Sequence, residues 1–114
     1  MAKFDIFSME FSRLYDLYLA KVAKKGRNRQ ELDRVLMHFC AVSRRQLSNW
    51  KQSGSVGEFV RRISASPALE NVGGSICGVK IENIRRPDMK TVRRLDKLVD
   101  ELAKGKSVEK IINR

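Results

Sequence analysis

The segment between Arg44 and Lys51 carries side chains of the types that read duplex DNA. Arg44 and Arg45 could each form a bidentate pair with guanine, Asn49 with adenine, and Ser48 with either base. Lys51, together with two arginines earlier in the chain, could hold phosphates. We therefore predict a nucleic-acid-binding surface made of Arg44, Arg45, Ser48, Asn49, Lys51, Arg27 and Arg29. The alternative is an ordinary helical corner whose polar face is solvated.

Catalytic chemistry is much less well supported by the sequence. Cys77 follows a glycine-rich stretch, but a cysteine nucleophile needs a neighbouring base. The single histidine, His38, is far away in the sequence. His38 and Cys40 are two positions apart on an expected helix, so they do not face each other as metal ligands would. We expect a protein without enzymatic activity, with no catalytic, cofactor or metal site. A Cys77–His38 enzyme is the alternative that these residues leave open.

The positive charge is large for the length of the chain. The 114 residues include 24 Lys and Arg against 13 Asp and Glu, a net charge of +11. Residues 21–51 hold nine basic and two acidic residues, a surplus of seven. Basic surfaces attract nucleic acid, anionic lipid or acidic proteins. The alternative is that this charge only keeps the protein soluble.

Hydrophobic periodicity predicts the elements that must position these residues. Apolar residues at helical spacing, with Ser8 as the first cap and Pro87 at the start of the last long segment, predict two long helices at about 9–25 and 87–104. Capping boxes at Asn28, Ser43 and Ser55 predict three more helices, and Ser107 begins a short last one. We therefore expect a single compact all-α domain, residues 1–114, of five or six helices framed by the two long ones.

One short segment has the period of a strand instead. Cys77, Val79 and Ile81 alternate with polar residues or glycine, and Phe4 and Ile6 alternate in the same way. A single strand would leave its backbone groups unpaired. We therefore predict a small two-stranded ribbon that pairs residues 3–7 with 77–81. The alternative is an extended segment laid over the helices.

Residues 32–54 resemble the helix-turn-helix of repressor-type DNA-binding proteins. The resemblance is carried by Ala41-Val42-Ser43-Arg44-Arg45-Gln46-Leu47-Ser48-Asn49-Trp50, which follows an amphipathic helix. It implies that the second helix reads the major groove with its outward face. Two positions depart from the usual pattern: Ala41 stands where glycine is common in the turn, and Met37 stands where a small residue lets the helices cross closely.

Most of the chain is similar to a bacterial family called domain of unknown function 2200. The resemblance rests on residues 18–21 and 24–27, on Ile76-Cys77-Gly78-Val79-Lys80-Ile81-Glu82-Asn83-Ile84, on residues 95–106, and on Glu109-Lys110-Ile111. It implies a small, mostly helical bacterial protein without an assigned activity, and it brings no catalytic residues.

Two classes of function therefore remain after the sequence analysis. The first is a basic, non-enzymatic nucleic-acid-binding domain. The second is a protein-interaction or structural module whose partner is another protein or a second copy of the chain. Apolar runs are too short for a membrane helix, no signal peptide is apparent, and two cysteines without a CxxC motif suit reduced thiols. We expect a cytoplasmic protein with no membrane contact.

Overall fold

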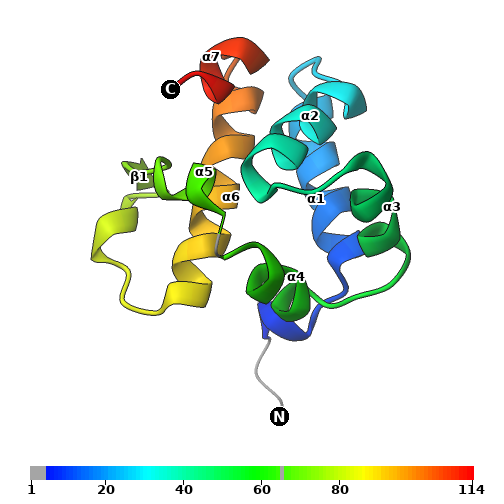
Figure 1. The fold of residues 1–114 in the computed structure, drawn as a ribbon. Coiled ribbons are helices and arrows are strands. Elements are labelled where there is room, and N and C mark those ends of the chain that lie inside the picture. The colour runs from blue at the N-terminus through cyan, green and yellow to red at the C-terminus, as the bar shows by residue number, and fades with distance from the viewer. Residues whose placement is uncertain (1–4, 65) are drawn as a thin grey trace.

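The computed structural model describes residues 5–64 and 66–114, and these residues form an almost entirely helical single domain (Figure 1). Two 3₁₀ helices, η1 and η2, and one small sheet complete the seven α-helices of the described part. The elements in chain order are η1 Ile6–Ser8, α1 Phe11–Ala23, α2 Arg29–Cys40, α3 Arg44–Gln52, α4 Val56–Ile63, α5 Pro67–Glu70, β1 Ser75–Ile76, β2 Val79–Lys80, η2 Ile81–Asn83, α6 Pro87–Ala103 and α7 Val108–Ile112. The all-α prediction is confirmed. The structure has one α-helix that was not predicted, the four-residue α5.

The two longest helices form the frame of the domain, as predicted. α1 and α6 lie against each other, α2 contacts both, and α4 lies across their lower ends in Figure 1. The apolar stripes of these helices meet in one continuous core. Its largest fully buried side chains include Phe11, Phe39 and Phe59, whose burial each removes a large apolar surface from water.

The three predicted capping boxes are confirmed at α2, α3 and α4. In each, a side chain of Asn28, Ser43 or Ser55 accepts a hydrogen bond from the backbone N–H three residues later. The Glu or Gln at that later position accepts a hydrogen bond from the backbone N–H of the cap. These bonds satisfy amide groups that have no partner within the helix, so local sequence alone determines where the three helices begin.

The start of α1 differs from the prediction. Ser8 is not its cap, because the Ser8 hydroxyl donates to Asp5 Oδ2 at 3.1 Å and the residue belongs to η1. The next residues are extended, since the Val56 N–H donates to the Met9 carbonyl at 2.8 Å and the Phe11 N–H donates to the Gly54 carbonyl at 2.9 Å. Because this long-range bridge between Glu10 and Ser55 keeps the backbone extended, α1 begins only at Phe11.

The two-stranded sheet exists, but its predicted pairing is wrong. β1 pairs antiparallel with β2, with Ile76 opposite Val79. Cys77 and Gly78 form the turn between them with φ angles of 53° and 79°, as a tight two-residue hairpin requires. Residues 6–8 instead form η1, and the part of the predicted partner strand at residues 3–4 lies outside the described residues. The nearer partner is favoured because closing a short loop costs less entropy.

Candidate functional site

The turn between α2 and α3 has a defined, left-handed geometry. Ala41 has a φ of 55° and ends α2, and the Val42 N–H donates to the Met37 carbonyl at 3.3 Å. Ser43 then caps α3, with its Oγ accepting from the Gln46 N–H at 3.1 Å. The turn thus joins α2 to α3 through three residues. Ala41 supplies the left-handed conformation that glycine usually supplies at the end of a helix.

A buried polar cluster fixes α3 to α1 and α2. The Tyr15 hydroxyl of α1 donates to Asp33 Oδ1 of α2 at 2.5 Å. Lys51 of α3 lies 3.4 Å from the same carboxylate, and its ammonium is 3.9 Å from the centre of the Tyr15 ring. Burial raises the pKa of Tyr15, and the hydrogen bond to Asp33 raises it further, so the phenol stays protonated. Together with the buried Leu47, this cluster sets the orientation of α3.

Four of the predicted site residues lie together on the outer side of α3. Arg44, Arg45, Ser48 and Asn49 are exposed. Within residues 5–64 and 66–114, none of their side chains forms a hydrogen bond or an ion pair. We call these four residues the α3 face. The structure therefore brings the predicted base-reading residues onto one accessible helix.

The three predicted phosphate-binding residues lie elsewhere or are engaged. Lys51 belongs to the buried cluster described above. Arg27 donates to the carbonyls of Leu102 and Lys106 at 3.0 and 2.9 Å and pairs with Glu31 at 2.6 Å, so it joins the start of α2 to the end of α6. Arg29 is exposed, but it lies in the first turn of α2, at the opposite end of that helix from Ala41. We leave all three out of the α3 face.

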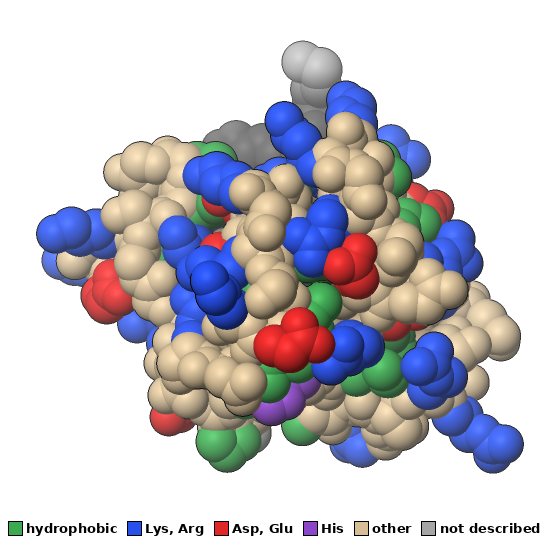
Figure 2. Space-filling model, turned by 90° about the horizontal axis from the view of Figure 1, so that it is seen from above, with side chains coloured by type: hydrophobic (Ala, Val, Ile, Leu, Met, Phe, Trp, Pro, Cys, Tyr) green, Lys and Arg blue, Asp and Glu red, His purple; other side chains and the backbone are tan. Residues whose placement is uncertain are grey.

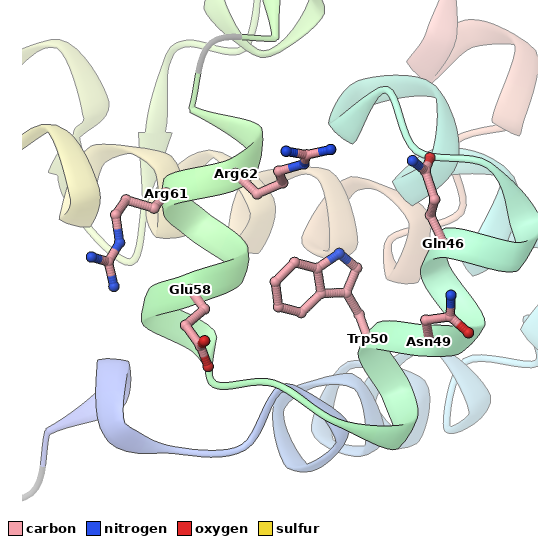
Figure 3. A pocket seen from close by; sticks show the side chains of 6 residues that line it. All are labelled: Gln46, Asn49, Trp50, Glu58, Arg61 and Arg62. Carbon is pink, nitrogen blue, oxygen red and sulfur yellow. The ribbon is translucent and has the colours of Figure 1, made fainter.

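A groove that the sequence analysis did not foresee lies between α3 and α4 (Figure 3). It has a volume of about 690 Å³ and is lined by Gln46, Asn49, Trp50, Glu58, Arg61 and Arg62. We call it the Trp50 groove. Figure 3 shows the indole reaching from α3 towards α4, with Arg62 extending across the groove above the indole and Arg61 directed away. Its sequence signal was a tryptophan between polar residues, followed by an arginine pair eleven and twelve positions later.

The Trp50 ring is held in place from two sides. Phe59 of α4 meets it edge to face, with ring centroids 5.4 Å apart. Gly54 has a φ of 135°, and a Cβ atom there would collide with the six-membered part of the indole. A larger residue at position 54 would therefore displace Trp50. The indole is half-buried and forms one wall of the groove.

The two cysteines and the histidine do not form a site. Cys77 is exposed at the tip of the hairpin, whereas Cys40 is buried and burial raises the pKa of its thiol to about 12. His38 is exposed on α2 and has its ring against Phe39. No group of three potential metal ligands comes together in the part of the chain that the structure describes. Among the same residues, no helix has the length and apolar character needed to cross a bilayer.

Positive side chains are distributed widely over the surface. Figure 2 shows the end of the molecule where α7 lies, with Lys and Arg spread across it and Asp and Glu between them. Many of the acidic residues are paired, for example Asp100 with Lys21 and Lys104. On this side, therefore, the net charge is not gathered into one patch.

The fold and the α3 face define a small, basic, helical protein with one core and one exposed polar helix. The chain belongs to the bacterial family described as "Uncharacterized protein conserved in bacteria" (DUF2200), whose model matches residues 5–113. This confirms the family resemblance seen in the sequence.

One solved structure, "Crystal structure of uncharacterized protein SP1917", is closely similar to this chain. The two chains are 33% identical and superpose with a TM-score of 0.88 over 95% of this chain and 90% of that chain. No curated protein matches the chain. None of these descriptions states an activity, ligand or partner, and the resemblance of residues 32–54 to a helix-turn-helix stays a prediction.

Proposed function

We propose that the protein binds duplex DNA, without catalysing a reaction, by inserting α3 into the major groove. The observation that carries this proposal is the α3 face, on which two arginines, a serine and an asparagine are exposed with no partner among the described residues. Arginine and asparagine are the side chains that pair bidentately with guanine and adenine. An unpaired guanidinium also needs no internal ion pair to be broken before it binds DNA.

The way α3 is held supports the same function. A reading helix must keep its orientation, because base contacts depend on placement within a fraction of an ångström. The cluster of Tyr15, Asp33 and Lys51 fixes α3 from behind, and the left-handed turn at Ala41 fixes its start. In this arrangement Lys51 is a positioning residue that supports the helix from within the domain.

Electrostatic attraction adds a part that does not depend on sequence. A net charge of +11 draws the protein towards the phosphates, and the released counterions make such binding weaken as salt rises. Each phosphate that the protein neutralises contributes about −0.9 to the slope of log affinity against log salt. Exposed cations near the α3 face, including Arg61 and Arg62 of α4, are available for these contacts.

The test is duplex DNA binding by fluorescence anisotropy over a series of salt concentrations. Replacing Arg44→Ala and Arg45→Ala together is expected to weaken binding about tenfold or more, since one good bidentate pair contributes about 1–3 kcal/mol. The control replaces Arg85→Ala and Lys110→Ala, two exposed cations away from α3, and so removes the same charge. We expect it to weaken binding only slightly.

Two results would contradict the proposal. If both double variants lose the same affinity, the binding is a general charge effect and α3 is not the reading helix. If the unchanged protein does not bind duplex DNA even at low salt, DNA binding is excluded and the interaction-module alternative takes its place.

A further inference from the structure

The Trp50 groove has a polarised lining, of which the duplex-binding proposal uses Asn49 for base reading and Arg61 and Arg62 only as nearby cations. On the α4 side, Arg62 extends across the groove above the indole (Figure 3), and its guanidinium has no ion pair or hydrogen bond among the described residues. Glu58 lies about one turn nearer the start of α4, where its carboxylate accepts a hydrogen bond from the Ser55 N–H at 3.0 Å. That hydrogen bond lowers the pKa of Glu58, so its charge stays on the helix cap. The groove thus has a positive part at Arg62 and a negative part at Glu58.

The α3 side of the groove adds an aromatic wall and two amides. The Trp50 ring is half-buried and fixed by Phe59 and Gly54. Its indole N–H forms no hydrogen bond within the described residues. Gln46 and Asn49 also line the groove from α3, and in Figure 3 the indole reaches further towards α4 than either amide. The Gln46 Oε1 already accepts from the Ser43 N–H at 2.8 Å, so Gln46 can offer its amide N–H groups, whereas Asn49 can both donate and accept. This wall therefore suits the polar edge of a flat ring.

Together these features define the chemistry of a fitting ligand. A flat ring would stack on a fixed aromatic side chain, because every base presents a π-face. A phosphate would be drawn to the unpaired guanidinium, which binds it through two parallel hydrogen bonds, and would avoid Glu58. The groove is wide open to solvent, so a ligand would lie along its lining with one side in water. An apolar ligand would leave the Arg62 guanidinium and the Asn49 amide without partners.

We propose that the Trp50 groove binds a nucleotide unit, with its base stacked on Trp50 and its phosphate held by Arg62. The two possible sources of this unit are a free nucleotide and a nucleotide of a single strand. The site is distinct from Arg44, Arg45 and Ser48 of the α3 face, although Asn49 contributes to both. It does not depend on duplex binding, so either proposal can fail while the other stands.

The experiment uses Trp50 as its own probe, because it is the only tryptophan of the chain. The full chain is titrated with adenosine monophosphate, and the tryptophan fluorescence is expected to be quenched to saturation. Arg62→Gln is expected to weaken binding about tenfold or more, as for a charged hydrogen bond. Lys110→Gln on α7, at the opposite end of the molecule from α4 in Figure 1, removes the same charge and is expected to change nothing.

A second ligand makes the test specific for the phosphate contact. Adenosine lacks the phosphate, so we expect it to bind the unchanged protein more weakly than the monophosphate does. We also expect adenosine to bind the Arg62→Gln variant as well as it binds the unchanged protein. A short single-stranded adenine oligonucleotide distinguishes the two sources. If the protein binds the oligonucleotide more tightly per site than the monophosphate, the natural ligand is a nucleotide of a single strand. If it binds the oligonucleotide equally or more weakly, the ligand is a free nucleotide. The Arg44→Ala, Arg45→Ala variant is expected to keep the quenching.

The proposal is overturned by any of three results. One is the absence of saturable quenching by both the monophosphate and the oligonucleotide up to about 10 mM, where even a millimolar complex would be largely formed. Another is an equal loss of affinity in Arg62→Gln and Lys110→Gln. The third is an equal effect of Arg62→Gln on adenosine and on its monophosphate, which would place the phosphate elsewhere.

Discussion

The side chain of Asp33 connects three helices through polar contacts. Its buried carboxylate accepts a hydrogen bond from Tyr15 of α1 and lies beside Lys51 of α3, while it belongs itself to α2. A buried carboxylate is stable only when such partners replace water. The orientation of the α3 face therefore depends on a residue that does not belong to it.

Replacing Asp33→Ala is expected to lower the free energy of unfolding by about 2–3 kcal/mol. The variant leaves the Tyr15 hydroxyl buried without its acceptor, and an unsatisfied buried group costs about 1–3 kcal/mol before the lost packing is added. Urea unfolding measures the change. The control is Asp16→Ala, an exposed acid of α1, which should change stability by less than about 0.5 kcal/mol. Equal effects of the two would show that the cluster has no structural role.

Glu101 makes stability depend on pH. Arg114 forms two hydrogen bonds to its carboxylate, at 2.5 and 2.9 Å, and Lys106 lies 3.8 Å away. Burial alone would raise the pKa of Glu101, but these cations outweigh it, and the pKa is lowered. A lowered folded-state pKa gives stability that is complete above the ordinary glutamate pKa of about 4.3 and is lost as the pH falls through the folded value.

Glu101→Gln is therefore expected to destabilise the protein at pH 7, and the difference from the unchanged protein should shrink as the pH falls from about 5 to about 3. Arg114→Gln should show the same trend, because it removes the cation that lowers the pKa of Glu101. Urea unfolding at a series of pH values measures both. A difference that stays constant from pH 7 to pH 3 would contradict the assignment.

At the scale of elements, the turn between α2 and α3 carries a conformational cost. Ala41 adopts a φ of 55°, which costs a residue with a Cβ atom about 1–2 kcal/mol. Ala41→Gly removes this cost but adds flexibility to the unfolded chain, an opposing effect of about 0.4–1 kcal/mol. We expect a net gain of about 0.5–1 kcal/mol, measured by thermal or urea unfolding.

The matched control for this prediction is Ala20→Gly. Ala20 is exposed within α1, where the backbone is helical, so the same replacement should lower stability by about 1 kcal/mol. Opposite signs for the two alanines support the left-handed turn. A loss of stability in both variants would contradict it.

Helix starts were predictable where their signals were local. The boxes at Asn28, Ser43 and Ser55 involve only residues three positions apart, so the sequence contains all their partners. Ser8 failed as a cap because the residues after it pair with a segment more than forty positions away. The hairpin was missed for a related reason: Cys77 takes a positive φ in the turn, and cysteine is no turn signal.

At the scale of the whole molecule, the total charge was known from the sequence but its availability was not. Arg27, Lys51 and Arg114 each contact partners that are distant in sequence, so only the folded chain shows that they are engaged. The α3 face could be predicted because a single helix carries it. The Trp50 groove could not, because Trp50 and Arg62 come from two helices whose relative placement depends on the packing of Phe59 and Gly54.

Because the two thiols differ in exposure, thiol-directed reagents are expected to modify the native chain at a single position. Cys77 is exposed at the hairpin tip, while Cys40 is buried with a pKa of about 12, and only thiolates react with maleimides and disulfide reagents. We expect Ellman's reagent to titrate one thiol in the native protein and two in urea, and two rapidly reacting native thiols would contradict the burial of Cys40. An acceptor dye on Cys77 would then form an energy-transfer pair with Trp50. Without any mutation, the chain would carry a spectroscopic ruler between its hairpin and its groove.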